Sequence, residues 1–64
     1  MTLIPVNSTA IAGVNFDGYT LYVQFHTSDE IYEHHGCPES LFEDLMNAPS
    51  MGEFYNKYIR GKFQ

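Results

Sequence analysis

The sequence predicts an α+β fold, in which a three-stranded antiparallel β-meander is followed by two short α-helices packed on one face of the sheet (β-β-β-α-α). Apolar and polar residues alternate over residues 19–26, and an Asp17-Gly18 pair typical of hairpin turns precedes them. The last third of the chain shows apolar residues at helical spacing. Because the 64 residues contain no repeat or linker, we expect residues 1–64 to form a single domain.

The three strands are predicted in the first half of the chain. The first runs from about Ala10 to Phe16 and ends at the Asp17-Gly18 turn. The second follows the turn, and period-two alternation turns its odd-numbered residues inward: Tyr19, Leu21, Val23 and Phe25. After turn-forming residues at 27–29, residues 31–35 can return as the third strand, because they are rich in β-branched and aromatic side chains.

The two helices are predicted in the second half. Pro38 suits a first helical turn, and the helix expected over residues 38–47 carries one apolar stripe made of Leu41, Phe42, Leu45 and Met46. Ser50 with Glu53 three residues later forms a capping box, which begins the second helix. Gly61 is typical of its end. The apolar face of this helix consists of Met51, Phe54, Tyr55, Tyr58 and Ile59.

Charge and composition restrict the classes of partner. Eight acidic and three basic residues give a net charge of −5, which opposes non-specific nucleic-acid binding, and we expect no contact with DNA. All three basic residues, Lys57, Arg60 and Lys62, lie in the last eight positions, so an anion is favoured there. The single cysteine cannot form an internal disulfide, and no apolar run approaches the roughly 20 residues of a membrane-spanning helix. We therefore expect a cytoplasmic protein without a membrane partner.

Most of the chain follows the pattern of one known family. The specific part spans residues 45–60, where the pattern Leu-x-x-Ala-x-Ser-x-Gly-x-Phe/Tyr-Phe-Asn-x-x-Ile-Arg is matched by Leu45, Ala48, Ser50, Gly52, Phe54, Tyr55, Asn56, Ile59 and Arg60. Earlier positions also match: Val6, Ser8-Thr9, Ile11, Val14, Phe16-Asp17, the strand at 21–25 and Tyr32, with His34 where the family usually has tyrosine. In these residues the chain resembles the KTSC domain, named for its occurrence at the C-terminus of some lysyl-tRNA synthetases.

The resemblance carries two implications about function. Attachment to a tRNA synthetase implies that some members contact RNA. Small single-domain versions are common in bacterial and phage genomes, and a phage-encoded version would suit an inhibitor that blocks a host protein or sequesters a nucleotide signal.

Four residues suggest metal or nucleophile chemistry: His26, His34, His35 and Cys37. Imidazole and thiolate are zinc ligands, and a nearby imidazole can activate a thiol. However, neighbouring strand residues such as His34 and His35 point to opposite faces, and no oxyanion hole is apparent. We expect one histidine packed on the helices, the other in solvent, and Cys37 as a small buried hydrophobe. We therefore expect no catalytic residue, no metal and no cofactor.

The candidate ligand-binding residues are Ser50, Asn56, Lys57, Arg60 and Lys62, with Ser8 and Thr9 as further candidates. The start of a helix and a guanidinium both favour phosphate or carboxylate. Structural explanations stay open, since Ser50 can act as a cap, Lys57 and Arg60 can offset the helix dipole, and Asn56 can bond a turn. Ser50 and Arg60 would lie roughly 15 Å apart along a helix, too far to hold one small anion within one subunit.

The leading hypothesis is a small non-catalytic binding module that takes a protein partner or a small anionic, nucleotide-like ligand. Ten aromatic residues exceed what a thin core can hide, so we also expect an exposed interface and a homo-oligomer. The alternative is an RNA-contacting accessory domain that uses the three basic residues and stacked tyrosines.

Overall fold

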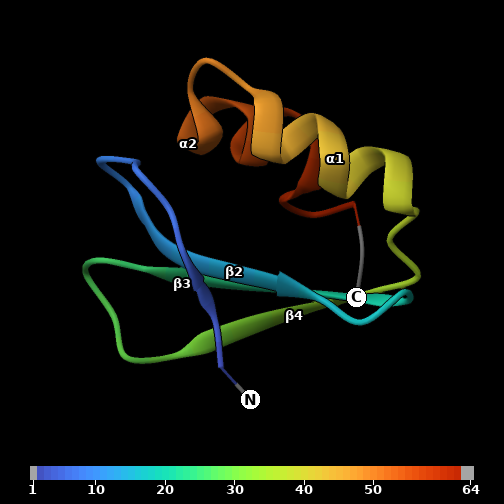
Figure 1. Cartoon of the computed structure of the whole chain (residues 1–64), viewed down its shortest axis with the longest axis horizontal. Coiled ribbons are helices and arrows are strands. Elements are labelled where there is room, and N and C mark those ends of the chain that lie inside the picture. Colours follow the sequence, from blue (N-terminus) through green and yellow to red (C-terminus); the bar gives the residue numbers. More distant parts are fainter. Residues whose placement is uncertain (1, 63–64) are drawn as a thin grey trace.

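The computed structural model describes residues 2–62 and contains one antiparallel sheet with its helices above one face (Figure 1). The strands β1 (Ile4–Pro5), β2 (Ile11–Phe16), β3 (Thr20–Phe25) and β4 (Ile31–His35) follow one another across the sheet. Above them lie α1 (Glu39–Asn47) and α2 (Met51–Phe54), and α2 continues into a π-helical turn, η1 (Tyr55–Ile59). We call α2 and η1 together the C-terminal helix. The predicted α+β class is confirmed, and both helical segments cover the same face.

The described sheet has four strands, and the prediction of three was wrong. β1 pairs antiparallel with β2 at the sheet edge, Ile4 opposite Val14 and Pro5 opposite Gly13. Two residues are too few to show an alternating pattern, and proline suits an edge strand because it donates no backbone hydrogen bond. β2 also begins one residue later than predicted, at Ile11.

The register of the strands brings the core residues onto the helix side of the sheet. Val14, Val23 and Tyr32 lie side by side across three strands, and so do Phe16, Leu21 and His34. The fully buried side chains come from both layers: Ile11, Val14, Leu21, Val23, Leu45 and Ile59. The inward face predicted for β3 is correct at Leu21 and Val23.

Tyr19 is an exception, because it was predicted to face inward and is 62% exposed. It precedes the first residue of β3, so it still belongs to the hairpin turn. The turn itself is as predicted: Gly18 has φ 99°, and the Asp17 carboxylate accepts hydrogen bonds from the Tyr19 and Thr20 amides at 2.9 and 2.6 Å. The turn therefore holds Tyr19 outside the core.

Both helices begin close to the predicted residues. Pro38 is extended and precedes α1, and Ser50 Oγ accepts the Glu53 amide at 3.4 Å as a cap. Gly61, with φ 75°, follows the last helical residues as predicted. The prediction of a plain second α-helix was wrong from Tyr55 onward, where the Arg60 amide bonds to the Tyr55 carbonyl at 2.8 Å, five residues back.

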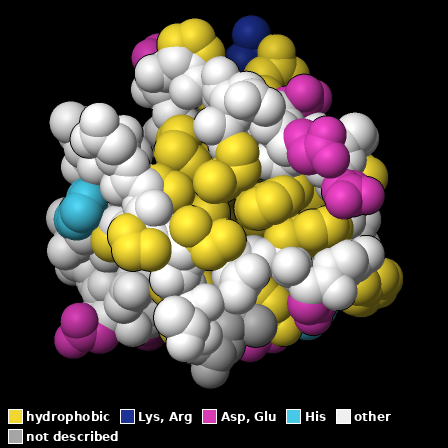
Figure 2. Space-filling view, viewed as in Figure 1, with side chains coloured by type: hydrophobic (Ala, Val, Ile, Leu, Met, Phe, Trp, Pro, Cys, Tyr) yellow, Lys and Arg dark blue, Asp and Glu magenta, His cyan; other side chains and the backbone are white. Residues whose placement is uncertain are grey.

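Hydrophobic side chains gather between α1 and the β1 edge of the sheet (Figure 2). Phe16 of β2 and Phe42 of α1 stack with ring centroids 5.1 Å apart, and β1 and α1 also carry the exposed hydrophobic residues Ile4 and Met46. An apolar surface of this kind is typical of an interaction site. Within residues 2–62, no helix has the length and apolar character needed to cross a membrane.

Candidate ligand-binding site

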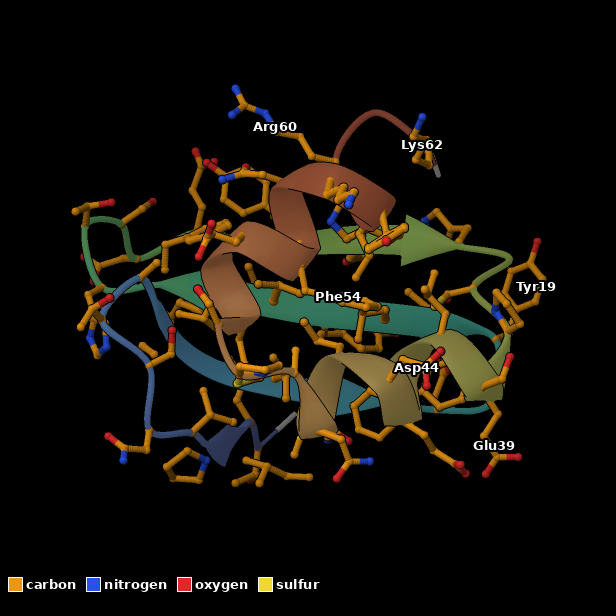
Figure 3. The ribbon with its side chains drawn as sticks, turned by 90° about the horizontal axis from the view of Figure 1, so that it is seen from above. Tyr19, Glu39, Asp44, Phe54, Arg60 and Lys62 are labelled. Carbon is orange, nitrogen blue, oxygen red and sulfur yellow. The ribbon has the colours of Figure 1, made fainter. Side chains whose placement is uncertain are left out.

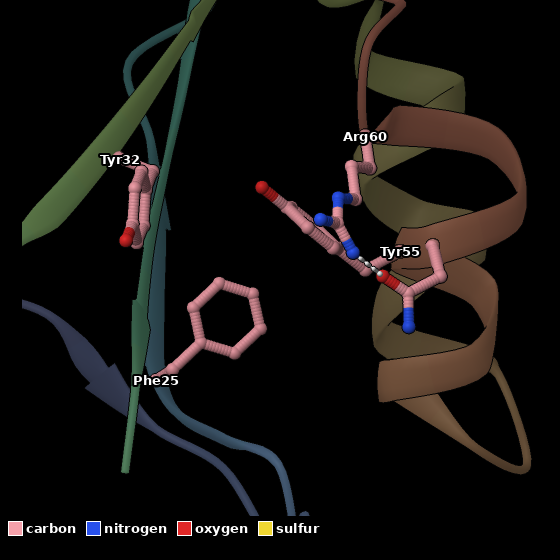
Figure 4. A pocket seen from close by; sticks show the side chains of 5 residues that line it. Phe25, Tyr32, Tyr55 and Arg60 are labelled. Atoms are coloured by element: carbon pink, nitrogen blue, oxygen red, sulfur yellow. Dashed lines mark hydrogen bonds between the residues drawn. The ribbon is translucent and has the colours of Figure 1, made fainter. Parts of the chain in front are cut away.

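A pocket of about 390 Å³ opens between the strands and the C-terminal helix. We call it the outer pocket, and its lining consists of Phe25, Tyr32, Tyr55, Asn56 and Arg60. Figure 4 shows Phe25 and Tyr32 on the strand side, with Tyr55 and Arg60 reaching toward them from the helix. Its volume falls in the range of small-molecule sites.

Aromatic rings form the inner wall of the outer pocket. The Phe25 ring makes edge contacts with Tyr32 and Tyr55, at centroid distances of 5.7 and 5.1 Å. Phe25 ends β3, Tyr32 lies in the neighbouring strand, and both residues are on the helix side of the sheet. Tyr32 is 40% exposed, so part of its ring remains available to a ligand.

Tyr55, which lines the outer pocket, also takes part in a buried hydrogen bond. Tyr55 Oη lies 2.8 Å from Nε2 of His34, and the two residues are 5% and 8% exposed. Burial raises the pKa of the Tyr55 hydroxyl, and the positive charge of Arg60 partly opposes this rise. The hydroxyl is therefore neutral at physiological pH and can take part in a hydrogen bond with the imidazole.

Polar groups lie at the mouth of the outer pocket. Arg60 Nη1 donates a hydrogen bond to Asn56 Oδ1 at 3.5 Å, one helical turn away, and both side chains are exposed. The guanidinium offers planar donors that match a phosphate or a carboxylate. The pocket thus combines an aromatic interior with a positive entrance.

A second, shallower pocket of about 300 Å³ lies where α1 meets the C-terminal helix. We call it the corner pocket, and its lining consists of Ala48, Pro49, Ser50, Glu53, Phe54, Lys57 and Tyr58. The Phe54 and Tyr58 rings lie 4.7 Å apart, and Lys57 Nζ is 5.2 Å from the Tyr58 ring centre. This pocket therefore also joins aromatic rings to one cation.

The seven predicted site residues do not form one cluster. Asn56 and Arg60 line the outer pocket, whereas Ser50 and Lys57 line the corner pocket. Lys62 follows the end of the helix and lines neither pocket. Ser8 Oγ caps a turn by accepting the Ala10 and Ile11 amides at 3.2 and 3.1 Å, and Thr9 is exposed beside it.

The aromatic residues of the outer pocket were not among the predicted site residues. Phe25 was predicted to face inward, Tyr55 was placed on the apolar face of the second helix, and Tyr32 was noted as a match to the family pattern. The available signal was the excess of aromatic residues over what a thin core can hide. Sequence alone gave no register to bring residues 25, 32 and 55 together.

The predicted surroundings of His34, His35 and Cys37 are confirmed. His34 packs on Tyr55, His35 is exposed, and Cys37 is buried. His26 bonds the Ser8 carbonyl through Nε2 at 2.9 Å. Among residues 2–62, no three His, Cys, Asp or Glu residues are grouped so that they could hold a metal ion.

Comparison with known proteins gives matches over most of the chain. The family model described as the KTSC domain matches residues 7–63. Over 45 residues, or 70% of this chain, the sequence is 49% identical to a lysine–tRNA ligase of Nostoc punctiforme and 42% identical to one of Trichormus variabilis. The matched segment is 8% of each ligase, so the chain corresponds to a small part of these relatives.

A solved structure has the same fold. The crystal structure of a KTSC domain protein from Yersinia pestis superposes with a TM-score of 0.90 at 32% sequence identity. The match covers 98% of this chain and 90% of that protein.

Proposed function

Because this chain belongs to the KTSC domain family, a small-domain family with no known catalytic role, we propose that it acts as a non-catalytic binding module. The outer pocket is the proposed site, and its ligand is a small anion that carries a flat ring, such as a nucleotide. The ring would contact Tyr32 and Phe25, and the anionic group would meet Arg60. Asn56 would add an amide for hydrogen bonding.

One observation carries this proposal: the Arg60 guanidinium stands at the mouth of an aromatic pocket on a protein of net charge −5. Figure 3 labels Arg60 and Lys62 at one edge of the molecule, with Glu39 and Asp44 of α1 on the other side. Acidic groups repel an anion elsewhere, so the positive edge is where it is favoured.

The test is a titration with uridine monophosphate and with uridine, followed by NMR or calorimetry. We expect the monophosphate to bind more tightly, because only it carries a group for Arg60. Arg60→Gln should weaken the binding of the monophosphate about tenfold or more, because this is the contribution of one hydrogen bond between charged groups. Lys62→Gln removes the same charge outside the pocket and serves as the matched control. Equal losses in both variants, or no binding by the parent protein, would refute the site.

The second candidate function is contact with RNA. It is favoured because the similar ligases are named for tRNA and because all three basic residues cluster at one end of the chain. Phosphate contacts release counterions, so RNA affinity would fall steeply as salt rises. A transfer RNA that does not bind even at low salt, where phosphate contacts are strongest, would exclude this function.

We also propose, as a separate property, that copies of the chain associate or bind a protein partner. The apolar surface beside β1, with Ile4 and Met46 exposed, supports an interface. Light scattering measures the subunit number directly. A monomer at millimolar concentration would rule out the homo-oligomer.

A further inference from the structure

We propose that the ligand of the outer pocket is part of a nucleotide chain that crosses the C-terminal helix and places a second base in the corner pocket. This inference rests on the function proposed for the outer pocket. It adds a second site and narrows the ligand to a single-stranded oligonucleotide. The argument starts from the arrangement of the two pockets.

The two pockets lie on opposite flanks of one helix. Asn56 and Arg60 line the outer pocket beside the strands, and Lys57 and Tyr58 line the corner pocket beside the end of α1. Figure 3 shows Arg60 reaching beyond β4, while Phe54 lies on the side toward α1. A helix with its side chains is about 10–12 Å across, so one base cannot occupy both pockets and a linked pair of nucleotides is needed.

Each pocket has the groups that hold a nucleotide. The outer pocket offers the rings of Phe25 and Tyr32, and the corner pocket offers Phe54 and Tyr58, of which Tyr58 is 46% exposed. Aromatic side chains stack with any base, because every base has a flat π face. Two separate aromatic sites on one helix therefore suit two bases of the same chain.

The cations stand where the linking phosphates would pass. Lys57 and Arg60 are three residues apart, less than one turn of this π-helical segment, and each lines a different pocket. Lys57 Nζ lies over the Tyr58 ring at 5.2 Å, so a base that takes this place would bring its phosphate to the ammonium group. An acidic peptide could also bind these cations. Its acidic side chains would not stack on the two aromatic sites, whereas the bases of a nucleotide chain would.

Glu53 also lines the corner pocket, and its charge opposes a phosphate there. The position of this charge leads to a further prediction. Glu53→Gln should tighten the binding of an oligonucleotide about two- to fivefold, the effect of removing one exposed like charge. A weaker complex in Glu53→Gln would contradict a phosphate in that position.

The test compares a tetrauridylate with uridine monophosphate on the full chain. We expect the tetranucleotide to bind at least tenfold more tightly, because the second contact becomes intramolecular. Tyr58→Ala should reduce the affinity for the tetranucleotide to that for the monophosphate. It should leave the affinity for the monophosphate unchanged. Tyr19→Ala, which removes another exposed tyrosine away from both pockets, should change neither.

Salt dependence adds a second measurement. Each lost phosphate contact should reduce the slope of log affinity against log salt by about 0.7 for a single strand, so Lys57→Gln should lower the slope by that amount. A twenty-nucleotide strand distinguishes the source of the ligand. Tighter binding than the tetramer indicates a segment within a long RNA, and equal binding indicates a short free chain.

Two results separate the failure of this inference from that of the proposed function. If the monophosphate binds but the tetranucleotide gains nothing, or if Tyr58→Ala leaves the gain intact, the crossing ligand is wrong and the outer pocket stands. If neither nucleotide binds, both proposals fail.

Discussion

The Tyr55 hydroxyl lies 2.8 Å from His34 Nε2, and this hydrogen bond joins the C-terminal helix to β4 close to the end of that strand. The rings of the two residues are also in edge contact, with centroids 5.3 Å apart. His34 therefore lies on the helix side of the sheet, where its buried Nε2 requires a hydrogen-bond partner. Tyr55 supplies that partner through the helix that carries the candidate site.

Tyr55→Phe should destabilise the fold. The substitution keeps the ring but leaves the buried His34 Nε2 without its hydroxyl, which costs about 1–3 kcal/mol of unfolding free energy. Urea unfolding measures the change. Tyr58→Phe is the matched control, because Tyr58 is 46% exposed and should change stability little. Equal stability of Tyr55→Phe and the parent protein would mean that the bond contributes nothing.

Cys37 should react slowly with alkylating reagents. The residue is 2% exposed, and burial raises the pKa of its thiol, so the reactive thiolate is scarce at neutral pH. We expect the rate with iodoacetamide to be at least tenfold below that of the urea-unfolded protein. A native rate equal to the unfolded rate would show that the thiol is accessible, and it would reopen the possibility of a nucleophilic cysteine.

Gly52 and Ala10 should behave as a coupled pair. A Cβ added at Gly52 would lie 3.0 Å from the Ala10 Cβ, so the turn before β2 packs directly on α2. Gly52→Ala should therefore lower stability by about 1–3 kcal/mol through overpacking.

In an Ala10→Gly background the same substitution should be neutral or stabilise by up to about 1 kcal/mol, since alanine favours a helix. The four proteins form a double-mutant cycle measured by thermal or urea unfolding. Additive effects would show that the two residues do not constrain each other.

Three strands and the start of each helix could be predicted because their signals are local. Alternation placed Leu21 and Val23 in the core, Asp17-Gly18 marked the hairpin, and Ser50 marked the cap. β1 could not be predicted, since two residues carry no period and its pairing with Val14 depends on a partner ten positions away. The π-helical turn at 55–59 gives no local signal either, because the helix simply gains one residue per turn there.

The candidate site was predicted only in part for a related reason. The basic residues are visible in the composition, but the pocket that holds Arg60 depends on how the helix lies over β3 and β4. The direction of each side chain separates Arg60 from Lys57, although the two are three residues apart. Aromatic residues such as Tyr32 are distant in sequence from Arg60, and only the register of the sheet brings them to the same pocket.

The Asp17 carboxylate should make the fold sensitive to acid. It accepts the Thr20 and Tyr19 amides, and these bonds hold the pKa of Asp17 below its ordinary value of about 3.9. A group whose pKa is lower in the folded state stabilises the protein fully above the unfolded value, and this stabilisation is lost as the pH falls through the folded pKa. We therefore expect this stabilisation by Asp17 to be lost below about pH 4.

Melting temperatures between pH 6 and pH 2.5 test this expectation. The parent protein should lose stability more steeply below pH 4 than Asp17→Asn, whose amide oxygen can still accept a turn amide but does not titrate there. Asp29→Asn, an exposed acid in the turn between β3 and β4, is the matched control and should follow the parent curve. If Asp17→Asn shows the same acid slope as the parent, the turn carboxylate does not set the acid limit, and another carboxylate must carry it.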